Sequence, residues 1–312
     1  MELKLKDALV VFNYHCVYEK NLTDKTLKAY SIDLDQFREY NGFNEILVQD
    51  FTKHHIKEYI KVLYDKGLKV KSIKRKAGTL KTFFSFLEFE DLITVSPFKK
   101  MKLSIKLPQT LPKTIDMKEL KRLFKYLYTY KDSVEDKSSY EYKYIVRDIA
   151  VIELLFATGM RVSELCNLKP SNINITQGTV HIFGKGRKER VIQICNPDVK
   201  KSLHEYFRLY KNKIVEINCF FISKFGTKFS EDSVRYMVTK FRKLSGIKTK
   251  ITPHQFRHTL ATGLLEESVD IRYIQMILGH SSILTTQIYT KVNSKQQKKI
   301  LATKHPRKHI YT

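Results

Sequence analysis

Residues 178–194 read GTVHIFGKGRKERVIQI and have the pattern of β-strands within an otherwise helical half of the chain. β-Branched and apolar residues lie on both sides of Gly184-Lys185-Gly186-Arg187-Lys188, whose glycines suit a tight reversal. This pattern predicts a β-hairpin. Because the rest of residues 114–312 has helical periodicity, the expected fold class is mainly α with a small antiparallel β-hairpin or sheet.

The first 95 residues have helical periodicity and no strand pattern. Apolar side chains recur every three or four positions in four stretches, with Thr52 as the expected N-cap of the third stretch. Four short amphipathic helices predict a small helical domain over residues 1–95. The four apolar stripes are Leu5, Leu9, Phe12 and Cys16; Leu27, Tyr30, Leu34 and Phe37; Ile56, Tyr59, Ile60 and Leu63; and Ile73, Ala77, Leu80, Phe84 and Leu87.

Two further stretches lack a helical stripe. Residues 96–113, SPFKKMKLSIKLPQTLPK, contain three of the seven prolines, which disfavour helix locally. We expect an extended basic linker here, one that would let two lobes close around a partner. Residues 129–147 are polar and tyrosine-rich, and they are expected to form a loop or insertion.

The charge of the chain points to a polyanionic partner. The 312 residues include 57 Lys and Arg against 32 Asp and Glu, a formal net charge of +25. So large a surplus most often indicates nucleic-acid binding, although a lysine-rich solvated surface is the alternative. The candidate nucleic-acid-binding residues are Lys71, Lys74, Arg75 and Lys76 in the fourth helix, Lys99 and Lys100 in the linker, and Arg187 and Lys188 in the hairpin turn.

Several classes of protein are excluded by the sequence. No apolar run approaches the roughly 20 residues that span a bilayer, so an integral membrane protein is not expected. The N-terminal apolar stretch is interrupted by Asn13 and His15, which argues against a signal peptide. The four cysteines are far apart and form no CxxC motif, so neither a disulfide framework nor a cysteine-based zinc module is predicted. A reducing, cytoplasmic compartment fits best.

The segment TPHQFRHTLAT, residues 252–262, predicts a helix that begins at Pro253 with a phosphate site at its N-terminus. His254 and Arg257 lie three residues apart on its first turn, which would place an imidazole beside a guanidinium. A zinc site is a weaker alternative: His254 and His258 have suitable spacing, but the expected Glu is replaced by Gln255. A purely structural His/Arg cluster is the other alternative.

A second helix is expected to begin at Asp270 and to end at Gly279, with Ile271, Ile274, Ile277 and Leu278 facing inward. His280 follows at its C-terminal end, and Tyr289 lies nine residues later. With 18 tyrosines in the chain, a packing role is the ordinary interpretation of Tyr289 by itself.

Two cations upstream also have ordinary interpretations. An apolar helix ends at Gly159, and Arg161 lies just beyond it, where an ion pair with Glu164 would account for it. Lys185, in the hairpin turn, would by itself be a solvated loop lysine. Each of these signals is weak when it is taken alone.

Together, the segments form a recognisable series. ATGMRVSEL (157–165), GKGRKER (184–190), QMILGHSSILTTQIYT (275–290) and HPR (305–307) occur in order. In residue identity and spacing they resemble the tyrosine site-specific recombinases, also called the phage integrase family, and most of all the bacterial Xer recombinases. The resemblance is specific over the C-terminal two-thirds of the chain and looser over the helical N-terminal domain.

The resemblance implies an enzyme that cuts and rejoins DNA through a covalent 3′-phosphotyrosine. Tyr289 matches the nucleophile, while Arg161 and Arg257 match the paired arginines that bind the scissile phosphate. His254 matches the general base or acid near the tyrosine oxygen, because a phenol with a pKa near 10 needs a proton acceptor at neutral pH.

The sequence also has suitable residues at the other catalytic positions of the family that it resembles. Lys185 matches the general acid that protonates the leaving 5′-hydroxyl, with Lys188 as a second, less favoured donor. His280 matches a residue that hydrogen-bonds the phosphate. The resemblance implies no metal and no cofactor, because two arginines replace the usual Mg²⁺ and the tyrosyl bond conserves the phosphodiester energy.

The family resemblance also implies an architecture. A SAM-like four-helix domain (1–95), the linker (96–113) and a catalytic domain (114–312) would form a two-lobed clamp on double-stranded DNA. We expect a homo- or hetero-tetramer on two synapsed sites, possibly with a second Xer-like recombinase, in the cytoplasm at the nucleoid. A helix at about 293–303 would dock into the neighbouring subunit, and a frayed basic tail is its alternative.

Within this class, resolution of chromosome or plasmid dimers is the favoured role. Integration or excision of a phage, transposon or integron element is the second. The residues 129–147 would then contact DNA or a neighbouring subunit. A catalytically silent DNA-binding protein of the same fold and a type IB topoisomerase are more distant alternatives.

Overall fold

The computed structural model describes residues 3–99, 101–107, 113–184, 189–279 and 293–310. The chain divides into two compact units, Met1–Thr110 and Leu111–Thr312. The division falls within the basic segment that the sequence predicts as a linker. Each unit has its own cluster of buried apolar side chains, and we describe each by itself.

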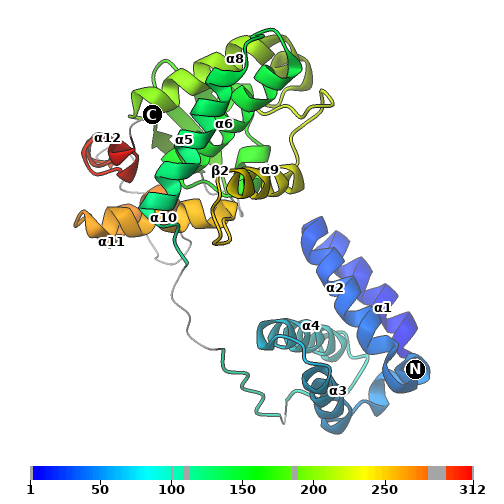
Figure 1. The fold of residues 1–312 in the computed structure, drawn as a ribbon. Coiled ribbons are helices and arrows are strands. Elements are labelled where there is room, and N and C mark those ends of the chain that lie inside the picture. Colours follow the sequence, from blue (N-terminus) through cyan, green and yellow to red (C-terminus); the bar gives the residue numbers. More distant parts are fainter. Residues whose placement is uncertain (1–2, 100, 108–112, 185–188, 280–292, 311–312) are drawn as a thin grey trace. The chain divides into compact units, whose positions relative to one another are not determined.

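The N-terminal unit is a helical domain, as its periodicity predicts (Figure 1). Its α-helices are α1 (Leu5–Tyr14), continued by a π-helical turn (His15–Glu19), α2 (Asp24–Arg38), α3 (Lys53–Asp65) and α4 (Val70–Phe89). Short 3₁₀ turns at Tyr40–Glu45 and Val48–Asp50 connect α2 to α3. The prediction of four helices is confirmed.

Aromatic packing closes the core of this unit. The Phe37 ring is fully buried and lies 5.0–5.5 Å, centroid to centroid, from the rings of Phe43, Phe51 and Tyr59. The Thr52 hydroxyl caps α3 by accepting a hydrogen bond from the His54 backbone N–H, so the predicted N-cap is confirmed.

The C-terminal unit begins with a long helical hairpin of α5 (Met117–Ser133) and α6 (Tyr140–Thr158). After α6 come α7 (Val162–Cys166), a 3₁₀ turn (Pro170–Asn172) and the strands β1 (Ile173–Asn174), β2 (Thr179–Phe183) and β3 (Glu189–Gln193). The unit continues with α8 (Pro197–Ile217), α9 (Glu231–Leu244), α10 (Pro253–Glu266), α11 (Ile271–Leu278), α12 (Asn293–Thr303) and a 3₁₀ turn (Pro306–His309).

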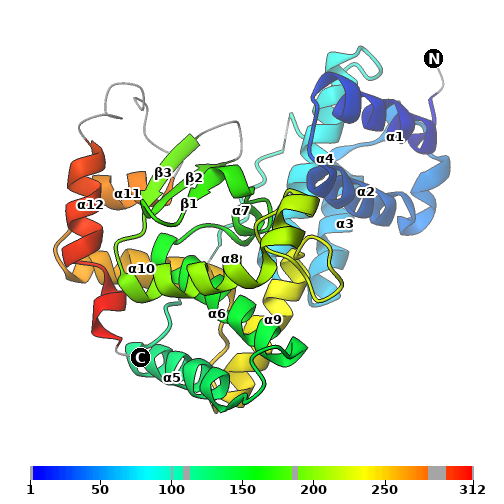
Figure 2. The same cartoon turned by 90° about the horizontal axis from the view of Figure 1, so that it is seen from above.

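The predicted hairpin is present. Strands β2 and β3 pair antiparallel, with Val180 opposite Ile192 and Ile182 opposite Arg190. Strand β1 adds a third, short strand against β2, which the sequence pattern did not reveal because it is only two residues long. Figure 2 shows this sheet next to α11 and α12.

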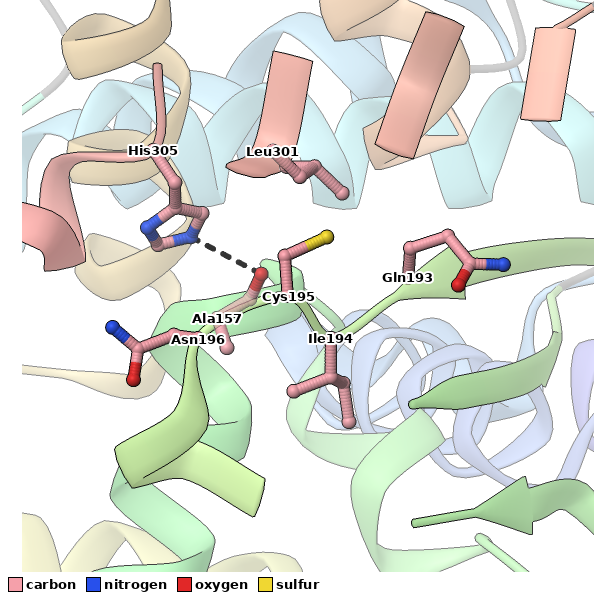
Figure 3. A pocket seen from close by; sticks show the side chains of 7 residues that line it. All are labelled: Ala157, Gln193, Ile194, Cys195, Asn196, Leu301 and His305. Carbon is pink, nitrogen blue, oxygen red and sulfur yellow. Dashed lines mark hydrogen bonds between the residues drawn. The ribbon is translucent and has the colours of Figure 1, made fainter. Parts of the chain in front are cut away.

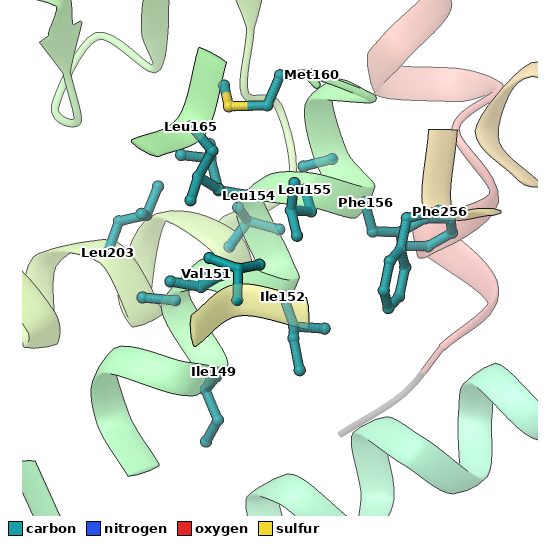
Figure 4. Packing of buried hydrophobic residues seen from close by; sticks show 14 of the residues in the cluster. Ile149, Val151, Ile152, Leu154, Leu155, Phe156, Met160, Leu165, Leu203 and Phe256 are labelled. Atoms are coloured by element: carbon teal, nitrogen blue, oxygen red, sulfur yellow. The ribbon is translucent and has the colours of Figure 1, made fainter. Parts of the chain in front are cut away.

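Helix α6 is the centre of the C-terminal core. Every residue from Ile145 to Thr158 is buried, and α5, α8 and α10 pack around the helix (Figure 4). Phe156 on α6 and Phe256 on α10 lie 6.4 Å apart, centroid to centroid. This contact fixes the first turns of α10 against α6, and α10 carries two of the predicted catalytic residues.

The structure corrects two expectations. Residues 129–147 are mostly helical, because α5 continues to Ser133 and α6 begins at Tyr140. Only residues 134–139 connect the helices. The tyrosines of this stretch, of which Tyr142 is buried and Tyr140 is exposed, had hidden an apolar stripe that includes Ile145. Ile271, expected to face inward, is 56% exposed because it lies at the first turn of α11. No helix among the described residues is long and apolar enough to cross a membrane.

Candidate active site

Arg161 is positioned by the break between α6 and α7. Helix α6 ends at Gly159, whose φ of +59° lies in the left-handed region that favours glycine. A Cβ there would approach Cδ2 of Leu278 to 2.7 Å, so glycine also allows the end of α6 to lie close to α11. Arg161 follows two residues later as the N-cap residue of α7.

The carboxylate of Glu164 holds Arg161 in place. It accepts hydrogen bonds from the backbone N–H and from Nη1 of Arg161, both at 2.8 Å. Arg190 of β3 donates to the same carboxylate at 3.0 and 2.7 Å. Burial of the Glu164 side chain favours its neutral form, but the hydrogen bonds from both arginines outweigh burial and lower the pKa of the carboxyl. Glu164 is therefore ionised at neutral pH.

Arg257 lies on α10, which begins at Pro253 as the sequence predicts. The residue is 5% exposed; Nη1 donates to the carbonyl of Gly159 at 2.8 Å and Nη2 to that of Leu278 at 2.6 Å. Burial first, and then the charges of Arg161 and Arg190, lower the pKa of Arg257 to about 10. The group is still protonated at neutral pH.

Three arginines therefore meet at the C-terminal end of α11. The carbonyls of Ile277, Leu278 and Gly279 accept from Arg190, Arg257 and Arg161 at 3.2, 2.6 and 3.5 Å, in that order. The last carbonyls of a helix lack partners within the helix and carry partial negative charge, so they favour cations there. The structure thus gathers cations from positions far apart in the sequence at the C-terminal end of α11.

His254 lies on the first turn of α10, three residues before Arg257, and its ring is accessible to solvent. Partial burial is the main cause that lowers the pKa of His254 below its ordinary value, followed by the charges of His258 and Arg257. The imidazole is therefore neutral at pH 7 and able to accept a proton.

A zinc site at His254 and His258 gains no support from the part of the chain that the structure describes. The group of three metal-ligating side chains found there, His15, Glu19 and Glu90, lies in the N-terminal unit.

Several predicted site residues lie outside the described residues. These are Lys185, Arg187 and Lys188 of the hairpin turn, His280 and Tyr289 after α11, and Lys100 of the linker. Their assignments stay predictions from the sequence.

The basic residues of α4 divide into two groups. Lys71 and Lys74 are exposed and stay candidates for DNA contacts, as does Lys99 in the linker. Arg75 also stays a candidate, because its side chain is about half exposed even though Nη1 donates to Asp33. The assignment of Lys76 to DNA binding is wrong, because this residue is 4% exposed and its Nζ lies 2.8 Å from a carboxylate oxygen of Asp33. Its ammonium is committed to a buried ion pair within the N-terminal unit.

Sequence reasoning missed Arg190 as a member of the site. In β3 the side chains alternate between faces, and Arg190 shares the inner face with the buried Ile192. An arginine on the inner face of a strand was the signal that could have revealed it, because a buried guanidinium requires a partner.

The C-terminal segment packs on its own unit. Gln297 of α12 donates to the carbonyl of Val191 in β3 at 3.2 Å. Nε2 of His305 donates to the carbonyl of Ala157 at 3.2 Å, beside a small pocket that Leu301 and Cys195 also line (Figure 3). The guanidinium of Arg307, which is 1% exposed, forms a bidentate ion pair with Glu153 of α6.

Comparison with known proteins agrees with this geometry. The phage integrase family matches residues 113–296, and the phage integrase N-terminal SAM-like domain matches residues 11–91. A tyrosine recombinase of Agathobacter rectalis is 46% identical over 95% of each chain. The tyrosine recombinase XerC of Thermodesulfovibrio yellowstonii is 33% identical, also over 95% of each chain.

Solved structures share the fold. The XerH site-specific recombinase bound to a palindromic difH substrate has a TM-score of 0.68 at 22% identity, with 91% of this chain and 81% of that chain covered. A lambda integrase dimer bound to a COC′ core site has a TM-score of 0.67 at 21% identity, with 90% and 96% covered.

The chain belongs to the phage integrase family. Within that family it is an Xer-like tyrosine recombinase, an enzyme that breaks and rejoins DNA strands. The recognition made from the sequence motifs is confirmed.

Proposed function

We propose that this chain is a site-specific recombinase of double-stranded DNA, with Tyr289 as its nucleophile and resolution of chromosome or plasmid dimers as its role. The observation that carries the proposal is the convergence of Arg161 and Arg257 on the end of α11, although 96 residues separate them in the sequence. Two forked guanidiniums can bind the non-bridging oxygens of one phosphate and stabilise the charge of its pentacovalent state.

In the proposed reaction the phenol oxygen of Tyr289 attacks the scissile phosphorus and the bond to the 5′ oxygen breaks. The phenolic proton passes to His254, whose lowered pKa keeps the ring neutral and ready to accept it. Lys185 protonates the leaving 5′ oxygen, and His280 hydrogen-bonds the phosphate. Attack by the 5′-hydroxyl of the partner strand reverses these steps and releases Tyr289.

We further propose that four subunits act on two synapsed sites in the cytoplasm, with the two units of the chain clamping the duplex. The exposed cations Lys71, Lys74 and Arg75 would contact phosphates, which gives affinity without sequence specificity. Helix α12, which packs on its own unit in the monomer, would dock into the neighbouring subunit. The partner is a second copy or a second Xer-like recombinase.

A covalent-trapping assay tests this proposal. Wild type and Tyr289→Phe are incubated in EDTA with fragmented DNA from the host and its mobile elements, then denatured, and the DNA attached to protein is sequenced. We expect adducts with the wild type alone. Recovered sequences near the replication terminus support dimer resolution, whereas element boundaries indicate integration. Tight DNA binding without adducts, even after addition of host extract, would contradict an active recombinase.

A further inference from the structure

Arg190 differs from Arg161, the other arginine that binds Glu164, in how its donors are used. Its side chain is 10% exposed, against 38% for Arg161. Nη1 and Nη2 of Arg190 donate to the two carboxylate oxygens of Glu164, and Nε donates to the carbonyl of Ile277. Arg190 is therefore largely buried with its donors paired, whereas the Arg161 side chain is partly exposed to solvent.

Glu164 is shared by two cations. Its carboxylate binds Nη1 of Arg161 at 2.8 Å as well as both terminal nitrogens of Arg190. If Arg190 were absent, the full charge of a buried carboxylate would act on Arg161. A bidentate guanidinium–carboxylate pair is strong in such surroundings, so the charge of Arg161 would be neutralised before a phosphate arrived.

Arg190 also packs against the residue that ends α11. Gly279 has a φ of +66°, and a Cβ on it would lie 3.0 Å from Cδ and 3.1 Å from Nη1 of Arg190. The end of α11 is thus fitted to this side chain. Because Arg190 lies on β3, it joins the β2–β3 pair to the same helix end that Arg161 and Arg257 contact.

We propose that Arg190 is a positioning residue that neutralises Glu164 and so keeps the charge of Arg161 available for the scissile phosphate. The inference rests on the proposed function for the role of Arg161. Arg161, Arg190, Arg257 and Glu164 together carry a net charge of +2. Arg190→Met lowers that charge to +1, and the further change Glu164→Gln returns it to +2.

The first test is the rate of adduct formation at saturating DNA in a single turnover. We expect Arg190→Met to slow this rate about tenfold or more, with the Kd for DNA changed less than about threefold. Arg190→Met combined with Glu164→Gln should be faster than Arg190→Met alone, and Arg190→Lys should lie between wild type and Arg190→Met. Arg122→Met, at an exposed arginine of α5 that bonds a carbonyl of the same unit, is the matched control and should act as wild type.

The second test uses orthovanadate, a phosphate analogue, and does not require DNA cleavage. Its affinity, measured by calorimetry, should fall in Arg190→Met and recover in the double variant. Thermal unfolding of every variant separates loss of fold from loss of charge. If the double variant is as slow and binds vanadate as weakly as Arg190→Met, or if Arg190→Met matches wild type in both assays, the inference is wrong.

The same assays distinguish a failure of the proposed recombinase function from a failure of the inference about Arg190. In one outcome, the wild type forms no adduct, but vanadate affinity still falls in Arg190→Met and recovers in the double variant. This outcome contradicts the recombinase activity and supports the role of Arg190. If the wild type and Arg190→Met form adducts at equal rates, the recombinase function is supported and the proposed role of Arg190 is contradicted.

Discussion

Arg257 joins the C-terminal end of α6 to that of α11, and the same guanidinium is proposed to bind the scissile phosphate. Both Nη atoms donate to backbone carbonyls, those of Gly159 and Leu278. A phosphate that arrives at this group meets a cation that is already fixed in place. Preorganised donors of this kind act strongly where charge develops in a transition state, because they need no rearrangement during the reaction.

Arg257→Ala should therefore slow adduct formation by about 10²–10³-fold. DNA affinity should change little, since many phosphate contacts share it. Arg257→Lys should also be slow, because an ammonium cannot fork onto two oxygens. Single-turnover adduct formation and a DNA-binding titration measure the two effects, with Arg122→Ala as the exposed control. An Arg257→Ala enzyme that cuts at the wild-type rate would remove Arg257 from the catalytic set.

The importance of Arg161 and Arg257 could be predicted from the sequence, but their arrangement could not. The motifs around each arginine resemble those of a known family, which was enough to assign both. Their common contact with the end of α11 arises from packing between α6, α10 and α11, which no local spacing reveals. Arg190 was missed for the same reason: its partner Glu164 lies 26 residues away.

At the scale of elements, α4 shows why a basic stretch cannot be interpreted from its sequence alone. The helix carries four adjacent or nearly adjacent cations, but helical rotation turns Lys76 toward α2, where it meets Asp33 and Gln36. The side chain of Asp33 is fully buried and is also bonded by Arg75 and Thr79. These partners lie 40 or more residues from the cations, so the sequence did not show which lysine is internal.

The two kinds of lysine should respond differently to substitution. Lys71→Ala with Lys74→Ala should weaken DNA binding and reduce its salt dependence by about 0.9 in log–log slope for each phosphate that the variant no longer neutralises. Lys76→Met should leave that slope unchanged and destabilise the N-terminal unit by about 1–3 kcal/mol, because it removes one partner of the buried Asp33 while Arg75 and Thr79 remain. DNA titrations at several salt concentrations, with thermal unfolding, check both. A reduced slope for Lys76→Met would restore it as a DNA-binding residue.

The C-terminal 3₁₀ turn should make stability depend on pH. Its N-cap residue His305 is neutral: Nε2 donates to Ala157, and Nδ1 accepts from the backbone N–H of Arg307. Burial lowers the pKa of His305 from 6.5 to about 4. Between these pH values the unfolded chain binds a proton that the folded chain does not. The contribution of His305 to the free energy of unfolding is therefore complete above pH 6.5 and is lost as the pH falls toward 4.

The difference between wild type and His305→Gln isolates this effect from other titrating groups. Between pH 6.5 and 4, wild type should lose about 3 kcal/mol more of its unfolding free energy than the variant, as a shift of this size implies. Denaturant unfolding at pH 4, 5, 6 and 7 measures the difference. Parallel pH profiles would show that His305 does not resist protonation in the folded state.

At the scale of the whole molecule, the fold class and helical content could be predicted from periodicity. Each unit has its own apolar core, which is the property that lets a unit fold as a domain. The errors lay where tyrosines hid an apolar stripe, near Ile145, and where a strand was too short to have a pattern, at β1. The chemistry, by contrast, could be predicted from motifs because the reaction restricts residue type more tightly than packing does.

The proposed mechanism requires that one tyrosine among 18 becomes covalently joined to the DNA strand through the 3′ phosphate. To test this, the trapped adduct is digested with protease and nuclease, and mass spectrometry identifies the modified peptide and the DNA end. We predict a peptide from QIYTK that carries a nucleotide on Tyr289 through a 3′ phosphate, together with a free 5′-hydroxyl on the released strand. A nucleotide on another residue, or a tyrosine joined to a 5′ phosphate, would contradict the proposed mechanism.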